Sequence, residues 1–151
     1  SELFFDEVRV PAANLLGADG GGFGALMSEL PQDRLSLAIS SMGAAQKAHD
    51  LTCAYVKERA VFGKTVMDFQ NTKFKLADLK AELAVGWAFI DQCLEQHVRG
   101  ALTNEGASIA KLWCSEMHGR LVDQCLQFFG GYGFMREYEI CRLYADARVQ
   151  R

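Results

Sequence analysis

The chain has 151 residues, which is enough for one domain with a sizeable core, and half of them are hydrophobic. Its net charge of −3 leaves no basic footprint for nucleic acid, and no apolar run approaches the roughly 20 residues of a membrane-spanning helix. The five cysteines are odd in number and lack C-x-x-C spacing, so they argue against a disulfide framework or a zinc site and for a reducing compartment.

Residues 1–18 differ from the rest of the chain. Residues 3–5 and 8–10 are short β-type runs, and the second of them ends at Pro11. Because the sequence has neither an initiator methionine nor a signal-peptide pattern, we interpret it as an interior piece of a longer polypeptide. The glycine-rich residues 19–24 lack the spacing of a nucleotide-binding G-x-G-x-x-G turn, so they predict a loop or hinge before the first helix.

Two long helices are predicted next. The first covers about 23–59, where Pro31 can bend it, and the second extends from Asp68, a candidate N-cap, to about 99–100. Apolar residues that step by three and four mark one face of each helix: Leu35, Ala38, Met42 and Ala45, then Leu76, Leu79, Leu83, Trp87, Ile90 and Leu94. Such stripes predict core positions and indicate nothing about ligands.

Two further helices complete the predicted fold. The third starts near Thr103 and stops at 130–131, and the fourth covers about 137–148. The apolar face of the third carries Ala110, Trp113, Met117, Leu121, Cys125 and Phe128. These lengths and short loops predict an all-α fold, an up-and-down four-helix bundle over residues 19–151 that follows a short β-type segment.

The histidines do not form a recognisable ligand set. No E-x-x-H or H-x-x-x-H pair occurs, so a di-iron bundle would lack its ligands. We therefore expect surface or partly satisfied helix histidines at His49, His97 and His118.

The connection at residues 57–64 has an unusual composition for a link between two helices. Arg59 and Lys64 can hold an anion such as a pyrophosphate, and Arg59 does so through a planar fork of donors. Phe62 supplies a flat apolar surface, and Gly63 lets the backbone pass close to a ligand. Taken alone, the segment is more simply interpreted as a charged helix end with a turn.

A second segment, Gln127-Phe128-Phe129-Gly130-Gly131-Tyr132-Gly133-Phe134, favours the ligand interpretation. Together the two segments resemble the C-terminal domain of the acyl-CoA dehydrogenases, flavoenzymes that introduce a 2,3-double bond into acyl-CoA thioesters. Other blocks at compatible spacing support the resemblance: Phe4 to Pro11, Asn14 to Gly17, Gln32 to Leu35, Phe69-Gln70 and Asp146 to Arg148. The blocks look most like the long-chain branch of the family.

The resemblance implies where cofactor and substrate contacts lie. Residues matching the family's flavin-nucleotide contacts are Arg59, Phe62 and Gln70, and residues matching contacts from the neighbouring subunit are Gln127, Gly130 and Gly131. A glycine pair is also an ordinary helix terminator. Arg34 matches a residue on the CoA side of the substrate channel, although a solvated helix arginine is the alternative.

The family's reaction needs a carboxylate base. Most members carry it in a Tyr-Glu-Gly-Thr segment beyond Asp146-Ala147-Arg148, and the sequence ends at Arg151, before that segment. A minority branch carries a glutamate immediately before the arginine of the first long helix, and Asp33 occupies that position before Arg34. Asp33 is therefore the candidate base, although it is one methylene shorter than glutamate. The alternative is a first-turn helix acid favoured by the helix dipole.

As a member of this family, the parent protein is expected to bind FAD and oxidise a fatty acyl-CoA to the trans-2-enoyl-CoA. Residues 1–18 would end the middle β-domain, and residues 19–151 would form the helical domain, truncated before its tail and inactive alone. The resemblance further implies transfer of electrons to an electron-transferring flavoprotein, a homotetramer or homodimer, and a location in the bacterial cytoplasm or mitochondrial matrix. The alternatives are a non-catalytic oligomerisation module and an acyl-CoA oxidase.

Overall fold

The structure is a computed structural model that describes residues 2–151, and the chain divides into two units with the boundary in the sequence between Leu30 and Pro31. In the N-terminal unit, the only regular structure among residues 2–21 is a 3-10 turn, η1 (Ala12–Asn14). The predicted β-type runs at 3–5 and 8–10 form no strand there. An isolated strand leaves its backbone donors and acceptors unpaired, and residues 2–30 provide no partner strand.

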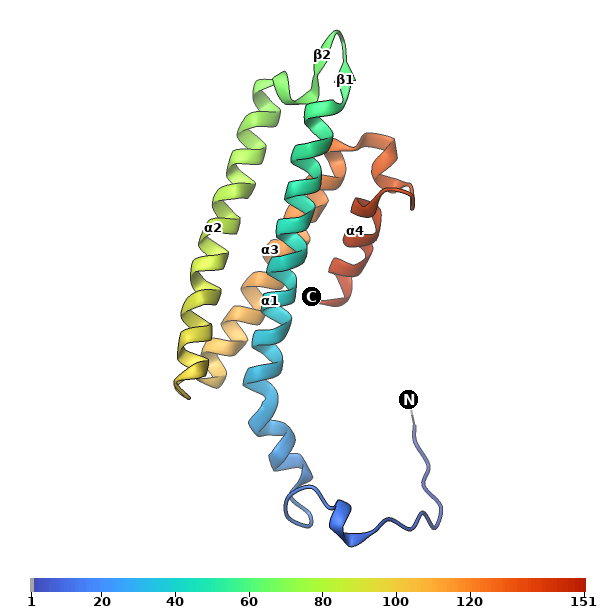
Figure 1. The fold of residues 1–151 in the computed structure, drawn as a ribbon, viewed down its shortest axis with the longest axis vertical. Helices are drawn as coiled ribbons and strands as arrows, with labels where there is room; N and C mark the ends of the chain where they lie inside the picture. The colour runs from blue at the N-terminus through green and yellow to red at the C-terminus, as the bar shows by residue number, and fades with distance from the viewer. Residues whose placement is uncertain (1) are drawn as a thin grey trace. The chain divides into compact units, whose positions relative to one another are not determined.

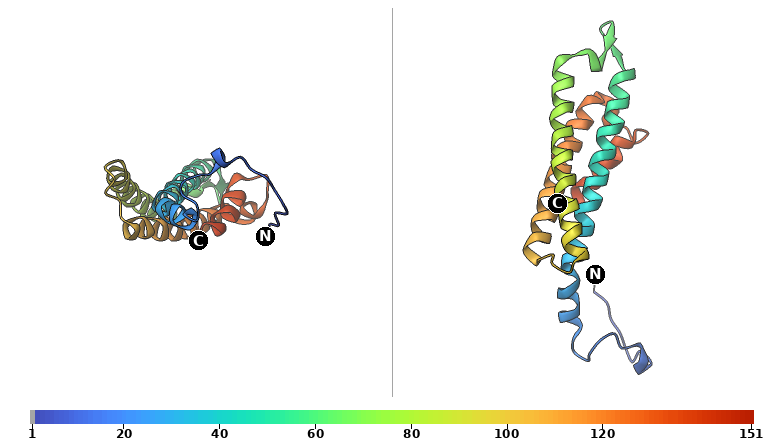
Figure 2. Two further views of the ribbon diagram at one scale, coloured as in Figure 1. Left: turned by 90° about the horizontal axis from the view of Figure 1, so that it is seen from below. Right: turned by 60° about the vertical axis from the view of Figure 1, so that its left-hand side comes forward.

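The C-terminal unit is the predicted up-and-down bundle, in which successive helices run in opposite directions (Figure 1). In chain order its elements are α1 (Gly22–Glu58, which begins in the N-terminal unit), β1 (Ala60–Val61), β2 (Lys64–Thr65), the 3-10 turn η2 (Val66–Asp68), α2 (Gln70–Val98), α3 (Asn104–Phe128), the 3-10 turn η3 (Gly130–Phe134) and α4 (Glu139–Val149). The β1–β2 hairpin and η3 lie at the same end of the bundle (Figures 1 and 2). None of the helices among residues 2–151 is long and apolar enough to span a membrane.

The core of the bundle follows the predicted apolar stripes. Fully buried side chains come from all four helices and include Ala38, Met42, Leu83, Ile90, Met117, Leu121 and Ile140. The two tryptophans, at 87 and 113, are only partly buried and pack against this core from its edge. The periodicity argument is therefore confirmed for α1, α2 and α3.

The helix ends correct the one predicted N-cap. The third helix starts near Thr103 as predicted, and Thr103 is its N-cap, because its Oγ1 accepts a hydrogen bond of 3.0 Å from the backbone N–H of Gly106. Asp68 does not cap α2, which begins two residues later. Its Oδ2 instead accepts hydrogen bonds of 2.8 Å from both the backbone N–H and the Oγ1–H of Thr65, which lower the pKa of the carboxyl group. Asp68 thus belongs to a Thr-x-x-Asp turn that closes η2.

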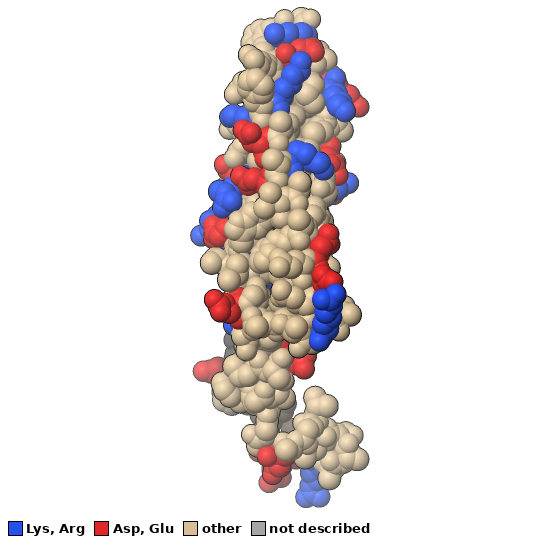
Figure 3. Space-filling model, turned by 90° about the vertical axis from the view of Figure 1, so that its left-hand side faces the viewer, with Lys and Arg blue, Asp and Glu red and all other residues tan. Residues whose placement is uncertain are grey.

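The outer face of α2 is solvated. Lys73, Lys75, Asp78 and Lys80 are exposed, whereas Glu82 is half-buried and lies 3.7 Å from the guanidinium of Arg120 on α3. Figure 3 shows charges of both signs interspersed over this side of the bundle. Such a mixture provides no extended field of one sign that would attract a charged partner.

Two helical glycines have opposite predicted responses to alanine. No atom lies within 4 Å of a Cβ added at Gly43 in α1, whereas a Cβ at Gly86 in α2 would lie 2.6 Å from Met42 Cε and 2.9 Å from Trp113 Cζ3. We expect Gly43→Ala to stabilise the fold by about 0.5–1 kcal/mol through helix propensity. Gly86→Ala should destabilise the fold by about 1 kcal/mol, because the added methyl group would overpack the core around Met42 and Trp113. Urea unfolding followed by circular dichroism measures both, and equal shifts for the two variants would contradict the prediction.

Candidate cofactor site

The predicted anion-binding connection folds into a small hairpin. Ala60 pairs with Thr65 and Val61 with Lys64, so Phe62 and Gly63 form a two-residue loop. Both loop residues have positive φ angles, 51° and 79°, as a type I′ turn requires. A phenylalanine in this region costs on the order of 1–3 kcal/mol of backbone strain. Phe62 is also 95% exposed, so its ring gains nothing from burial within this chain.

A groove of about 600 Å³ lies beside this hairpin, between the C-terminal end of α1 and the turn that follows α3. Its walls are lined by Tyr55, Arg59, Val61, Val66, Gln127, Phe128, Phe129, Gly130, Gly131, Tyr132 and Met135. The backbone fixes the end of α1 here, since Arg59 N–H donates to Tyr55 O and Val66 N–H donates to Arg59 O, each at 2.8 Å. On the opposite wall, Gly130 turns the chain out of α3 with a φ of 57°.

Four aromatic rings support the wall of the groove. Tyr55 stacks on Phe129 with a centroid distance of 4.1 Å, and Tyr138 meets both rings edge-on at 6.2 and 5.9 Å. Tyr138 also stacks on Tyr132 at 5.3 Å, and the guanidinium of Arg59 lies 5.3 Å from the centre of the Tyr132 ring. Burial raises the pKa of Tyr55 and Arg59 only partly opposes this, so the phenol stays neutral at neutral pH.

The groove brings together four of the six residues that the sequence analysis assigned to the cofactor. Arg59 comes from the end of α1, and Gln127, Gly130 and Gly131 come from the end of α3 and the start of η3. The other two do not line it. Phe62 lies exposed at the hairpin tip, and Gln70 is the exposed first residue of α2.

The two predicted substrate-side residues lie elsewhere on α1. Asp33 is exposed and Arg34 is half-buried, at the opposite end of the bundle from the hairpin. At about 1.5 Å per residue, the 26 positions between Asp33 and Arg59 correspond to about 39 Å along the helix. Neither residue can therefore take part in the groove of its own chain.

The donor set of the groove fits a dinucleotide cofactor better than a reaction centre. A guanidinium and a side-chain amide can bind phosphate and hydroxyl oxygens, aromatic walls can contact a planar ring, and two glycines leave the backbone open to close approach. The lining contains no carboxylate, histidine or cysteine that could transfer a proton. The aromatic support was missed from the sequence, although Tyr55 lies one helical turn before Arg59.

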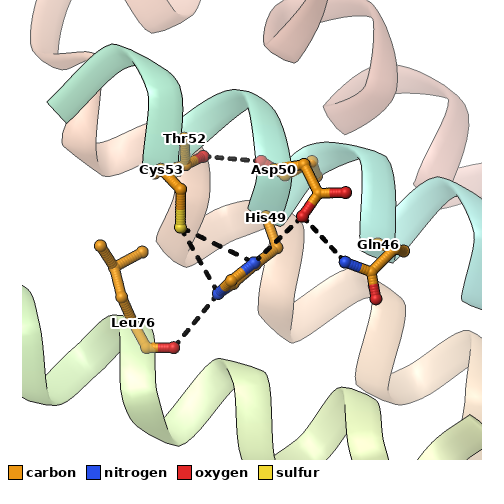
Figure 4. Close-up of polar contacts among 7 residues, drawn as sticks. Gln46, His49, Asp50, Thr52, Cys53 and Leu76 are labelled. Atoms are coloured by element: carbon orange, nitrogen blue, oxygen red, sulfur yellow. Dashed lines mark hydrogen bonds and ion pairs between the residues drawn. The ribbon is translucent and has the colours of Figure 1, made fainter. Parts of the chain in front are cut away.

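A separate polar cluster joins α1 to α2 (Figure 4). His49 Nε2–H donates to the backbone carbonyl of Leu76 at 3.2 Å, and Cys53 Sγ lies 3.8 Å from both ring nitrogens. Asp50 Oδ1 lies 3.6 Å from Nδ1 and also accepts a hydrogen bond from Gln46. Burial raises the pKa of the Cys53 thiol, so this cluster ties two helices together and does not provide an activated nucleophile.

His118, Cys114 and Cys125 are buried inside the bundle. His118 is buried, which lowers its pKa, and its Nδ1–H donates to Gln150 Oε1 at 3.2 Å. His97 is half-buried. Burial raises the pKa of Cys114 and Cys125 to about 11, so both are thiols at neutral pH. Within residues 2–151, no three histidine, cysteine, aspartate or glutamate side chains are arranged to hold a metal ion.

Comparison with known proteins identifies the family. Residues 20–151 match the family described as acyl-CoA dehydrogenase, C-terminal domain. The chain is 47% identical over 150 residues to the mitochondrial long-chain specific acyl-CoA dehydrogenase of Sus scrofa, covering 99% of this chain and 35% of the relative. An acyl-CoA dehydrogenase structure from Geobacillus kaustophilus has a TM-score of 0.91 at 45% identity and matches 97% of this chain and 39% of its own. A structure described as an electron transferring flavoprotein of Acidaminococcus fermentans matches with a TM-score of 0.91 at 29% identity, over 97% of this chain and 38% of its own.

The chain therefore spans little more than a third of the length of these relatives, and the part that it spans is their helical C-terminal domain. The matched range covers every helix of the bundle, and the resemblance inferred from the two motif segments is confirmed. The chain belongs to the acyl-CoA dehydrogenase family.

Proposed function

We propose that this chain is the C-terminal domain of an FAD-dependent acyl-CoA dehydrogenase that acts on long-chain fatty acyl-CoA. The parent enzyme removes a proton from the α-carbon and a hydride from the β-carbon, and the product is the trans-2-enoyl-CoA. FAD supplies the hydride acceptor, and the residues of this chain bind and orient cofactor and substrate. The long-chain assignment rests on 47% identity to a long-chain specific relative.

The observation that carries the proposal is the convergence of four predicted cofactor residues on one groove. Arg59 is 68 positions away from Gln127 in the sequence, yet both line the same groove, together with Gly130 and Gly131. Gly130 also terminates α3 at a positive φ, but the fold of the bundle gives no reason for an arginine and a glutamine to line the same groove. Cofactor binding explains why a cation and an amide occur together beside two adjacent glycines.

We assign proton abstraction to Asp33 and a CoA contact to Arg34. Both lie about 39 Å along α1 from the groove. This distance supports an assembly in which the groove contacts the FAD of a neighbouring subunit and Asp33 serves a different FAD. A homotetramer or homodimer meets that requirement.

The partners and location follow from the same assignment. We infer that the reduced flavin passes electrons to an electron-transferring flavoprotein, and that the protein works in the mitochondrial matrix or the bacterial cytoplasm. The similarity to a chain in a structure described as an electron transferring flavoprotein supports the partner. The named long-chain relatives are mitochondrial, and other relatives are bacterial.

Anaerobic titration of the whole protein tests the proposal. Palmitoyl-CoA is expected to bleach the flavin band near about 450 nm, because hydride transfer reduces the bound cofactor. CoA without an acyl group is the control and should leave the spectrum unchanged. Oxygen consumption in the absence of an acceptor protein would instead indicate an oxidase. A colourless protein that cannot be reconstituted with FAD would contradict the proposal and favour the oligomerisation module.

A further inference from the structure

The guanidinium of Arg59 is held by an aromatic ring and not by a carboxylate. Its central carbon lies 5.3 Å from the centre of the Tyr132 ring, within the range of a cation–π contact. Among residues 2–151, the arginines at 99, 120 and 151 pair with glutamates, whereas no ion pair involves Arg59. The contact with Tyr132 is thus the interaction that fixes this side chain at the edge of the groove.

This mode of support leaves the binding capacity of the guanidinium unused. The group carries five N–H donors, and the face of an aromatic ring offers them no oxygen acceptor. A carboxylate partner would occupy two of those donors and neutralise the charge. A tyrosine ring does neither, so Arg59 keeps its positive charge and its in-plane donors for an anion in the groove.

Tyr132 is itself held in place on its other side. Its ring stacks on Tyr138 at 5.3 Å with an angle of 21° between the planes, and Tyr138 packs edge-on against Phe129 and Tyr55. Tyr132 is 40% exposed, so the outer part of its surface is not needed for the core. The ring connects the rigid aromatic cluster to a long, otherwise mobile arginine side chain.

We propose that Tyr132 is a positioning residue, which orients the Arg59 guanidinium toward the diphosphate of a dinucleotide bound in the groove. The inference rests on the proposed function and deepens it. An arginine that is already oriented loses less side-chain entropy when it binds the anion. The residue between the glycines at 131 and 133 is therefore predicted to tune cofactor affinity through its contact with Arg59.

The test measures FAD affinity of the whole apoprotein by quenching of flavin fluorescence. Tyr132→Leu is expected to weaken FAD binding by about threefold to tenfold, and the matched control Tyr132→Phe, which keeps the ring, should stay within about twofold of the parent. Tyr132→Trp should bind at least as well as the parent, because indole gives the best cation–π face. Unfolding midpoints of all variants establish that they are folded.

A double-mutant cycle separates positioning from a structural role. Arg59→Ala should weaken FAD binding by about tenfold or more, and adding Tyr132→Leu to it should cause no further loss. Additive losses, or a Phe variant as weak as the Leu variant, would overturn the role of Tyr132. An Arg59→Ala variant with unchanged FAD affinity would instead count against the groove as the cofactor site and hence against the proposed function.

Discussion

Asp33→Asn in the whole enzyme is expected to slow reduction of the bound flavin by palmitoyl-CoA by about a hundredfold to ten-thousandfold, the range over which general bases contribute. Asparagine keeps the size and shape of the side chain but cannot accept the α-proton. Rapid mixing under anaerobic conditions measures the rate directly. FAD content should not change, because Asp33 lies about 39 Å along α1 from Arg59.

The surroundings of Asp33 support this choice of base. The side chain is exposed, and within residues 2–151 its carboxylate takes part in no hydrogen bond or ion pair between side chains. A carboxylate committed to capping or to an ion pair would be less free to accept a proton. The neighbouring Arg34 is half-buried, so the pair combines a free acid with a partly fixed cation.

The matched variant Asp33→Glu restores the residue of the family's minority branch and is expected to raise the rate of flavin reduction. The longer side chain moves the carboxylate by about 1 Å, a displacement that can change a rate by two orders of magnitude. If Asp33→Asn reduced the flavin as fast as the parent, the base would have to come from another part of the enzyme. Asp33 would then be a solvated acid of the helix surface.

Helix periodicity in the sequence was sufficient to predict most of the bundle. Stripes such as Leu76, Leu79 and Leu83 identify buried faces, because a helix of this length must cover one apolar face with its neighbours. The hairpin after α1 was not predicted. Its loop residues are Phe62 and Gly63, and a phenylalanine at positive φ lacks the Asn-Gly or Asp-Gly signal that indicates a type I′ turn.

The candidate site was predictable only in part for a similar reason. Motif spacing selected Arg59, Gln127, Gly130 and Gly131, and the structure brings them to one groove. Their aromatic support depends on packing among three separate segments, which no local pattern in the sequence encodes. Asp68 was misassigned because an aspartate before a helix resembles an N-cap, although here it is the last residue of a Thr-x-x-Asp turn.

Gly133→Ala is expected to destabilise the fold by about 3 kcal/mol, at the upper end of the usual cost of overpacking. A Cβ at this position would lie 2.6 Å from the backbone oxygen of Leu126 and 3.0 Å from its Cγ. That oxygen belongs to the last turn of α3 and already accepts a hydrogen bond of 3.0 Å from Phe129 N–H. The Leu126 oxygen cannot move away from the added Cβ without opening the end of the helix, whereas the end of a flexible side chain could move aside.

The matched control is Gly131→Ala in the same turn, where an added Cβ meets no atom within 4 Å. Its free energy of unfolding should stay within about 0.5 kcal/mol of the parent, as for most surface changes. Urea unfolding compares the two variants, and equal stability would contradict the role of the Leu126 contact. Because Leu126 precedes Gln127, displacement of this turn also moves one wall of the groove, so Gly133→Ala should weaken FAD binding even in the fraction that remains folded.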